Sequence, residues 1–232
     1  MVASSKLAWF VAGLGLFGAL TMPVGRSAPA IPGPYCGVSD FKKADVQEQR
    51  CLQQLSQFAS RKGVALVLHL DGGATKTIKS NPKACQDDNA KGCVRSYLVG
   101  YHAGAGLFLV FRSYYEGWDY LLVSARNGAE TTLGDRPHFA PDGSTFVIVD
   151  SQEEYAQDYY FAVGTVATDP PKITWKNHDN ILGEWEFQRW IDKDHVAVVL
   201  VTQTRDCPEP KCDAVLARKG EDWRLEFVRA GK

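Results

Sequence analysis

The six cysteines of this 232-residue chain are the residues whose types and spacing point most directly to chemistry. In an oxidising compartment thiols form disulfides, and an even number lets every sulfur pair. Closing a short loop loses the least chain entropy, so we predict pairing between sequence neighbours among the roughly 15 possible pairings. The predicted disulfides are Cys36–Cys51, Cys85–Cys93 and Cys207–Cys212. Zinc ligation is the alternative, but these spacings differ from the C-x-x-C pairs of structural zinc sites.

Candidate catalytic groups are few. In the segment His69-Leu70-Asp71 a histidine and an acid alternate onto one face of a predicted strand, which is the arrangement of a general base held by a carboxylate. A surface histidine beside a turn aspartate has the same pattern. No serine lies in a nucleophile-elbow motif, and disulfide-bonded cysteines are not nucleophiles. We therefore assign no catalytic residue, although this does not settle whether the protein is an enzyme.

No other group of residues predicts a metal or cofactor. The remaining histidines are isolated from one another, without the spacing of metal ligands; they are His102, His138, His178 and His195. The segment Asp87-Asp88-Asn89 lacks the alternating oxygens and distal glutamate of a calcium loop, so we expect it to be a solvated loop. We expect no metal site and no cofactor.

Aromatic rings and acids gather at one predicted hairpin turn. The cluster also includes Tyr120, and the candidate binding residues within it are Tyr114, Tyr115, Glu116, Trp118 and Asp119. Flat amphipathic rings give contact area at small entropic cost, so such a group can stack on sugars or anchor a protein partner. The alternative is that alternate rings fill the core between sheets. A second candidate is the charged loop 205–212, whose predicted disulfide would hold it as a rigid tip for recognition or simply protect the surface.

The first thirty residues predict export. A short basic start is followed by the uncharged apolar run 7–24, and Ala28 and Ala30 supply the small residues of a signal peptidase site. We predict a signal peptide over residues 1–30. The alternative is an uncleaved membrane anchor, because about 18 apolar residues are the lower limit for a span. Both predict that the rest of the chain works outside the cytoplasm, in the periplasm or secreted.

Charge excludes one class of partner. Residues 1–30 contain two basic residues and no acid, so their removal changes the net charge from −1 to −3. A mildly acidic chain without clustered Lys and Arg has no electrostatic footprint for nucleic acid. The remaining 202 residues are enough for one domain with one core, so we predict a single β-rich domain over 31–232.

One helix is expected, over about 45–62. Asp45 and Glu48 have the spacing of an N-cap followed by an acid at the third helical position, and Gly63 suits the position after a helix end. A disulfide needs Cα atoms within about 7 Å, so either the helix begins near Asp45 and residues 37–44 fold back, or Cys36 pairs with another cysteine; we favour the first.

The rest of the chain is predicted to be β-structure, in blade-like repeats over about 63–228. Val, Leu, Phe, Tyr and Trp are enriched in short segments separated by turn residues. The expected strands are 64–70, 95–102, 107–113, 118–125, 129–133, 144–150, 158–167, 172–175, 184–191, 195–203, 213–218 and 222–228. Three segments, 95–134, 135–176 and 183–228, repeat the same order of a short strand, a long apolar strand, another strand and a short strand, and repeats of this length with four strands each are typical of propeller blades.

Part of this pattern resembles a known family. His138-Phe139-Ala140-Pro141-Asp142-Gly143 and the apolar run after it resemble the core of the TolB-type, WD-like β-propeller repeat. The best copy covers residues 136–150, with weaker copies around 95–134 and 183–228. The resemblance implies four-stranded antiparallel blades. Closed propellers have at least about four blades, so we expect a partial or small propeller, with the N-terminal helix covering an open sheet edge.

These features favour binding over catalysis. We expect an exported, non-enzymatic binding protein of the bacterial cell envelope that recognises a protein or an envelope component through blade loops. The alternative is an envelope hydrolase acting on glycan or peptide with acids such as Asp71, Glu116 or Asp119. A membrane contact is expected only through an uncleaved N-terminal segment.

Overall fold

The computed structural model describes residues 36, 43–86, 91–149, 159–177, 183–204 and 207–228. Contacts divide the chain into two units, Met1–Ile31 and Pro32–Lys232, and the described residues all belong to the second. The predicted signal peptide over 1–30 and the segment Asp87-Asp88-Asn89 lie outside the described residues, as does His178. None of the helices in the described ranges is long and apolar enough to span a bilayer.

The N-terminal helix is shorter than predicted. Helix α1 covers Ala44–Gln54, so its start agrees with the prediction. Residues 55–62 are not helical, and Ala59–Lys62 form strand β1 instead. β1 pairs antiparallel with β2 (Ala65–His69), and Gly63 lies in the tight turn between them at φ +57°. Pairing with β2 overrides the local helical pattern, and Gly63 serves a hairpin where we expected a helix end.

The predicted N-cap is also wrong. Lys43 occupies the N-cap position, and no side chain caps the helix there. Asp45 lies in the first turn instead, where its charge still suits the positive end of the helix. Glu48 is buried and turned toward the neighbouring strands, where it finds donors stronger than a helix amide.

The first sheet has the order β1-β2-β3. A short 3₁₀ turn, η2 (Asp71–Gly73), leads from β2 to β3 (Thr75–Lys79), which the sequence analysis did not predict. Its alternation of polar residues around the single buried Ile78 gives little apolar signal. A second short helix, α2 (Pro82–Gln86), follows and was also not predicted.

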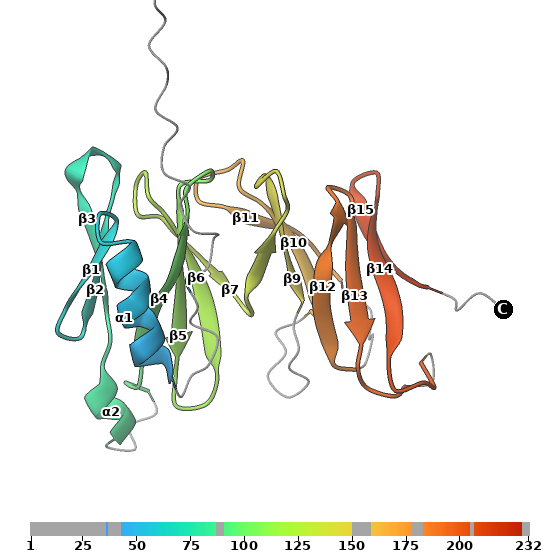
Figure 1. Cartoon of the computed structure of the whole chain (residues 1–232), viewed down its shortest axis with the longest axis horizontal. Helices are drawn as coiled ribbons and strands as arrows, with labels where there is room; N and C mark the ends of the chain where they lie inside the picture. Colours follow the sequence, from blue (N-terminus) through green and yellow to red (C-terminus); the bar gives the residue numbers. More distant parts are fainter. Residues whose placement is uncertain are drawn as a thin grey trace, which may run out of the picture. The chain divides into compact units, whose positions relative to one another are not determined.

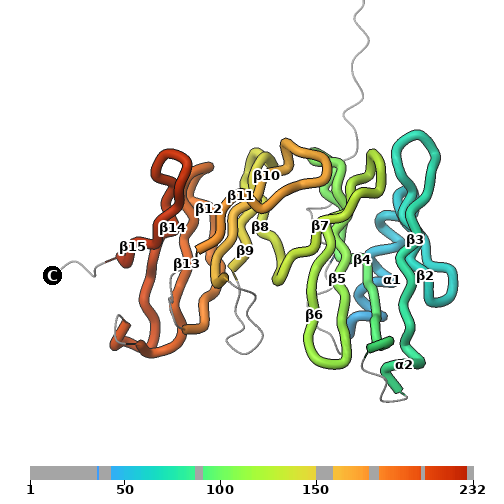
Figure 2. Tube along the Cα trace, turned by 180° about the vertical axis from the view of Figure 1, so that it is seen from behind, coloured from blue at the N-terminus to red at the C-terminus, as the bar shows by residue number. Residues whose placement is uncertain are grey.

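Three four-stranded antiparallel sheets follow, each built from four consecutive strands, as predicted for blade-like repeats (Figures 1 and 2). The first contains β4 (Arg95–His102), β5 (Leu107–Ser113), β6 (Trp118–Ser124) and β7 (Glu130–Leu133). The second contains β8 (Pro137–Phe139), β9 (Thr145–Val149), β10 (Phe161–Thr165) and β11 (Lys172–Lys176). The third contains β12 (Trp185–Asp192), β13 (His195–Leu200), β14 (Cys212–Lys219) and β15 (Asp222–Phe227).

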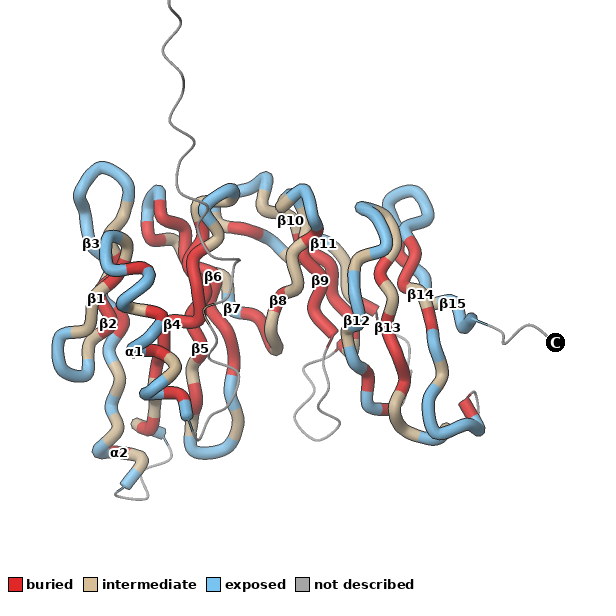
Figure 3. Tube along the Cα trace, viewed as in Figure 1, coloured by how far each residue is buried: buried red, intermediate tan, exposed pale blue. Residues whose placement is uncertain are grey.

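The sheets pack through two apolar clusters, which Figure 3 shows as buried central strands. Strand β9 takes part in both, because its side chains alternate between the two faces of its sheet. Phe146 and Ile148 pack with Leu109 and Leu122 of the first four-stranded sheet. Val147 packs on the other side, in the cluster that includes residues of β13 and β14. The middle sheet is therefore covered on both faces. The fold is mainly β, and α1 is the longer of the two α-helices in the described residues.

The structure confirms all three predicted disulfides. The Cα–Cα distances are 5.0 Å for Cys36–Cys51, 4.4 Å for Cys85–Cys93 and 5.8 Å for Cys207–Cys212. Each distance lies within the range that a disulfide spans without backbone movement. All six sulfurs are thus used, which leaves no thiolate for the zinc alternative.

Candidate functional site

The predicted aromatic cluster lies at the turn between β5 and β6. The amide of Tyr114 donates a hydrogen bond of 2.9 Å to the carbonyl of Gly117, which closes a tight turn. Gly117 has φ +113°, a conformation that other residues rarely adopt. We call residues 114–118 the hairpin tip. Its backbone is held by the turn and by the β5–β6 ladder that leads into it.

An ion pair between Arg112 and Asp119 lies at the base of the hairpin tip. Arg112 and Asp119 are direct cross-strand partners in β5 and β6. The guanidinium donates two hydrogen bonds to the carboxylate, from Nε to Oδ1 at 2.7 Å and from Nη2 to Oδ2 at 2.5 Å. Asp119 is only 8% exposed, and such a bidentate pair fixes both side chains in one geometry.

Tyr114 completes a three-residue network with this pair. Its hydroxyl donates to Oδ2 of Asp119 at 2.9 Å, and its ring lies 5.7 Å from the guanidinium carbon of Arg112. Burial and the neighbouring Asp119 carboxylate raise the pKa of Tyr114 to about 12, so the phenol stays protonated and remains a donor. Burial lowers the pKa of Arg112, but hydrogen bonds and charge from Asp119 outweigh it and raise the pKa overall.

The other predicted residues of the cluster face solvent. Tyr115 is 47% exposed and Trp118 is 41% exposed, and Glu116 between them is exposed as well. The ring of Tyr120, by contrast, is buried 5.3 Å from that of Phe111. The two interpretations of the cluster therefore apply to different residues. Tyr120 fills the core, whereas Tyr115 and Trp118 give the hairpin tip an amphipathic surface.

The charged loop closed by Cys207–Cys212, which we call the stapled loop, occupies in the third four-stranded sheet the position that the hairpin tip occupies in the first. It connects β13 to β14, the second and third strands of their sheet, just as the hairpin tip connects β5 to β6. Pro208 to Lys211 are exposed, whereas Cys207 is buried. Thr204 donates its amide to the carbonyl of Cys207 at 2.8 Å, which narrows the base of the loop. Residues 205 and 206 lie outside the described part of the chain.

His69 and Asp71 contact other residues and do not form the predicted catalytic pair. His69 Nδ1 lies 3.1 Å from the carbonyl of Gln57, so it carries the proton and donates there. Nε2 then accepts from the hydroxyl of Ser60 at 3.4 Å. The exposed Asp71 lies in η2, where its amide donates to the carbonyl of Ala125. His69 thus joins the segment before β1 to β2.

The other described histidines also have structural contacts. His102 packs on Phe139 at a ring distance of 4.6 Å. His138 stacks on Phe187 of β12 at 3.8 Å, and burial, followed by the charge of Arg136, lowers the pKa of His138 to about 4. His195 lies 2.8 Å from Asp192 in the β12–β13 turn.

A second polar site, which the sequence analysis missed, lies at the edge strand β4. Glu48 of α1 accepts from the amide of Leu98 at 2.7 Å and pairs with Arg61 of β1, whose Nε lies 3.0 Å from Oε2. Arg61 Nη2 bonds both Glu48 and the carbonyl of Ser96, the latter at 2.7 Å. The amide of Cys36 donates to the carbonyl of Val99 at 2.9 Å. These contacts cover the open edge, the role expected for the N-terminal helix.

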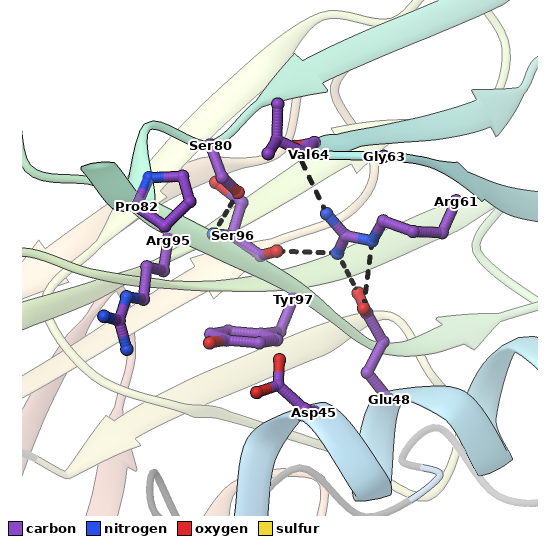
Figure 4. Close-up of a pocket in the computed structure, with 10 residues that line it drawn as sticks. All are labelled: Asp45, Glu48, Arg61, Gly63, Val64, Ser80, Pro82, Arg95, Ser96 and Tyr97. Atoms are coloured by element: carbon purple, nitrogen blue, oxygen red, sulfur yellow. Dashed lines mark hydrogen bonds and ion pairs between the residues drawn. The ribbon is translucent and has the colours of Figure 1, made fainter. Parts of the chain in front are cut away.

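This edge site borders a cavity of about 410 Å³ between α1, the first sheet and β4 (Figure 4). In the sequence, Glu48 and Arg61 both fall within the predicted helix over 45–62, so nothing indicated a contact between them. They are thirteen residues apart, a separation that indicates no contact in a continuous helix. They come together because β1 runs back beside α1.

No family model matches this chain, and no curated protein matches it. The resemblance of residues 136–150 to the TolB-type repeat therefore stays a prediction.

Proposed function

We propose that this chain is an exported, non-enzymatic binding protein of the bacterial cell envelope that recognises a protein partner through the hairpin tip. The observation that carries the proposal is the exposure of Tyr115 and Trp118 on a turn held by a bidentate ion pair. Aromatic anchors dominate the binding energy of many interfaces, and a rigid backbone lowers the entropy lost on binding.

The surroundings of the two rings favour a protein partner. Glu116 adds a charge at the rim of the patch, and polar rims around aromatic anchors are typical of protein interfaces. Both exposed rings come from one tight turn, so they form a small protruding contact. A protruding tip suits insertion into a partner's groove better than enclosure of a free sugar. The stapled loop between β13 and β14 is a second contact at the equivalent position.

Export is supported by two features. The three disulfides persist in oxidising compartments, and the predicted signal peptide over 1–30 would deliver the chain to one. A periplasmic or secreted location is therefore part of the proposal. The predicted kinship with WD-like propeller repeats fits the same role, because loops at the ends of blades are common binding surfaces.

The hydrolase alternative lacks a supporting observation. Asp119 accepts three hydrogen bonds, two from Arg112 and one from Tyr114, so most of its acceptor capacity is used within the fold. A glycosidase needs two carboxyl groups on either side of a substrate, roughly 5–9 Å apart. Glu116 lies on an exposed turn, which does not exclude water or enclose a sugar.

Site-specific photocross-linking tests the proposal. A photoreactive phenylalanine analogue replaces Tyr115 in the full-length protein, which is expressed in its native host and irradiated. We expect one discrete protein adduct, and Trp118→Ala in the same protein should lower its yield about tenfold or more, because clustered anchors act together. The matched control carries the analogue at Ile191, which is exposed on β12. The same adducts from both positions, or none from Tyr115, would contradict the proposal.

A further inference from the structure

The cavity beside β4 is a second candidate site, separate from the hairpin tip. None of its lining residues belongs to residues 114–118, and its volume of about 410 Å³ lies within the usual range for small-ligand pockets. The lining comes from α1, from β1 and the β1–β2 turn, from the segment between β3 and α2 with the first residue of α2, and from β4 (Figure 4). Several separate segments thus converge on one hollow.

Two of the four charged groups in the lining form an ion pair. Glu48 and Arg61 neutralise each other, and Glu48 also accepts from the amide of Leu98. Arg61 also donates to the carbonyl of Ser96. This pair therefore holds α1 against β4 and contributes no net charge to the cavity.

Arg95 and Asp45 are the other two charged residues of the lining. Arg95 lies two residues from Tyr97 on β4, so both side chains lie on one side of the strand. Figure 4 shows the Asp45 carboxylate reaching toward the Tyr97 ring from α1. Burial raises the pKa of Tyr97 and the charge of Asp45 raises it further, whereas the charge of Arg95 and a side-chain hydrogen bond between Arg95 and Tyr97 lower it. A positive and a negative group thus lie around one phenol.

The polar lining is incompletely satisfied. Nε of Arg95 and Oγ of Ser96 are both buried without a hydrogen-bond partner, and Ser96 is only 1% exposed. Unpaired buried polar atoms are rare in native proteins, and each calls for an explanation such as a catalytic role or a bound water or ion.

We infer that the cavity binds a small zwitterion, an amino acid or short peptide, with its carboxylate on Arg95 and its amine on Asp45. Guanidinium groups recognise carboxylates through paired hydrogen bonds, and a carboxylate accepts from an ammonium group. The hydroxyls of Ser80 and Tyr97 supply further polar contacts along the wall. A ligand with both charges leaves the cavity neutral, whereas an anion or cation alone would leave one wall charge unpaired.

Three related dipeptides test the inference on the unmodified full-length protein. Ala-Ala carries both charges, N-acetyl-Ala-Ala lacks the amine, and Ala-Ala amide lacks the carboxylate. In titrations to about 10 mM followed by amide NMR shifts, we expect Ala-Ala to move the resonances of Arg95, Ser96 and Tyr97. Each capped form should bind about tenfold more weakly or worse, since one charge-assisted contact is gone. Equal binding of all three, or no shift with Ala-Ala, would overturn the inference.

Substitutions locate the two contacts. Arg95→Gln should weaken Ala-Ala about tenfold or more and leave Ala-Ala amide unchanged, because the amide has no carboxylate to lose. Asp45→Asn should weaken Ala-Ala in the same way and leave N-acetyl-Ala-Ala unchanged. The matched control Arg189→Gln removes an exposed arginine from β12 and should have no effect. A loss that is equal for every dipeptide would contradict the assigned contacts, and the dipeptide series on the unmodified protein is independent of how any variant folds.

Discussion

The first four-stranded sheet is stabilised by two arginine–carboxylate pairs, and the two pairs connect different parts of the structure. Glu48–Arg61 joins α1 and β1 to the edge strand β4, and its oxygens also satisfy strand backbone. Arg112–Asp119 joins neighbouring strands β5 and β6 and satisfies only side chains, including the hydroxyl of Tyr114. The first pair makes contacts that the sheet would otherwise lack. The second strengthens a hairpin that the backbone ladder already holds.

This difference separates folding from recognition. Without Glu48 and Arg61, β4 would expose backbone groups at an open edge, which is a hazard for aggregation. Without Arg112 and Asp119, the β5–β6 ladder would remain, but the turn above it would lose its support. We therefore expect the edge pair to govern stability and the hairpin pair to govern the display of Tyr115 and Trp118.

Removal of the edge carboxylate should have the largest effect on stability. Glu48→Ala leaves Arg61 without its counter-charge and the Leu98 amide without its acceptor, which should lower the free energy of unfolding by about 3–5 kcal/mol. Urea denaturation followed by tryptophan fluorescence measures the change. Glu226→Ala removes the exposed partner of Lys219 and should cost less than about 1 kcal/mol. Similar losses for both variants would break the comparison.

Acidification should act at a third place, which has no ion pair. The folded-state pKa of His138 is about 4, below the unfolded value of about 6.5, so the unfolded chain binds the proton first as the pH falls. The contribution of His138 to the free energy of unfolding is fully present above about pH 6.5. It falls by about 3 kcal/mol as the pH is lowered to about 4.

Urea denaturation at several pH values measures this loss, and His138→Phe, which keeps a ring against Phe187, isolates it. The variant should lose about 3 kcal/mol less than the unmodified protein between pH 7 and pH 4. Parallel pH profiles for the two proteins would show that His138 does not contribute.

The hairpin pair should have a smaller effect on stability and a larger one on the tip. Asp119→Asn weakens both bonds from Arg112 and the bond from Tyr114, at a cost of about 1–2 kcal/mol, because Arg112 is partly solvated. Cross-linking from position 115 should fall strongly in this variant. Asp194→Asn, at an exposed pair with Arg218, is the control and should change neither quantity. Unchanged cross-linking in Asp119→Asn would show that the Arg112–Asp119 pair does not contribute to recognition.

The smallest effect on stability should come from the anchors themselves. Trp118→Ala and Tyr115→Ala should each change the free energy of unfolding by about 0.5 kcal/mol or less, since both side chains are exposed. Binding of the cross-linked partner should nevertheless weaken by about 2 kcal/mol or more for at least one of them. Ile191→Ala, equally exposed, should alter neither property. Loss of stability matching loss of binding would assign both residues to the core.

Most of the fold followed from local patterns. Strands such as Arg95–His102 and Leu107–Ser113 are dense in apolar β-formers and are bounded by turn residues, so their predicted limits agree with the structure. The disulfides followed from loop entropy because each pair is close in sequence. Strand β1 was missed because Ala59–Lys62 continue a helical pattern, and only pairing with β2 reveals their conformation.

The candidate site was predictable in composition but not in roles. The sequence placed Tyr114, Tyr115, Trp118 and Asp119 at one turn, but two-residue alternation alone did not show which rings face solvent. The Arg112–Asp119 register needs the turn closed at Gly117, and the edge site needs three segments brought together. Contacts of this kind depend on tertiary structure, so no local pattern reports them.

Backbone ¹⁵N order parameters of Tyr115, Glu116 and Gly117 test the central claim, that the ion pair below the hairpin tip holds it rigid for recognition. We predict values of about 0.85, as in rigid backbone, which should fall toward about 0.6 in Asp119→Asn. Values already below about 0.6 in the unmodified protein would contradict the account.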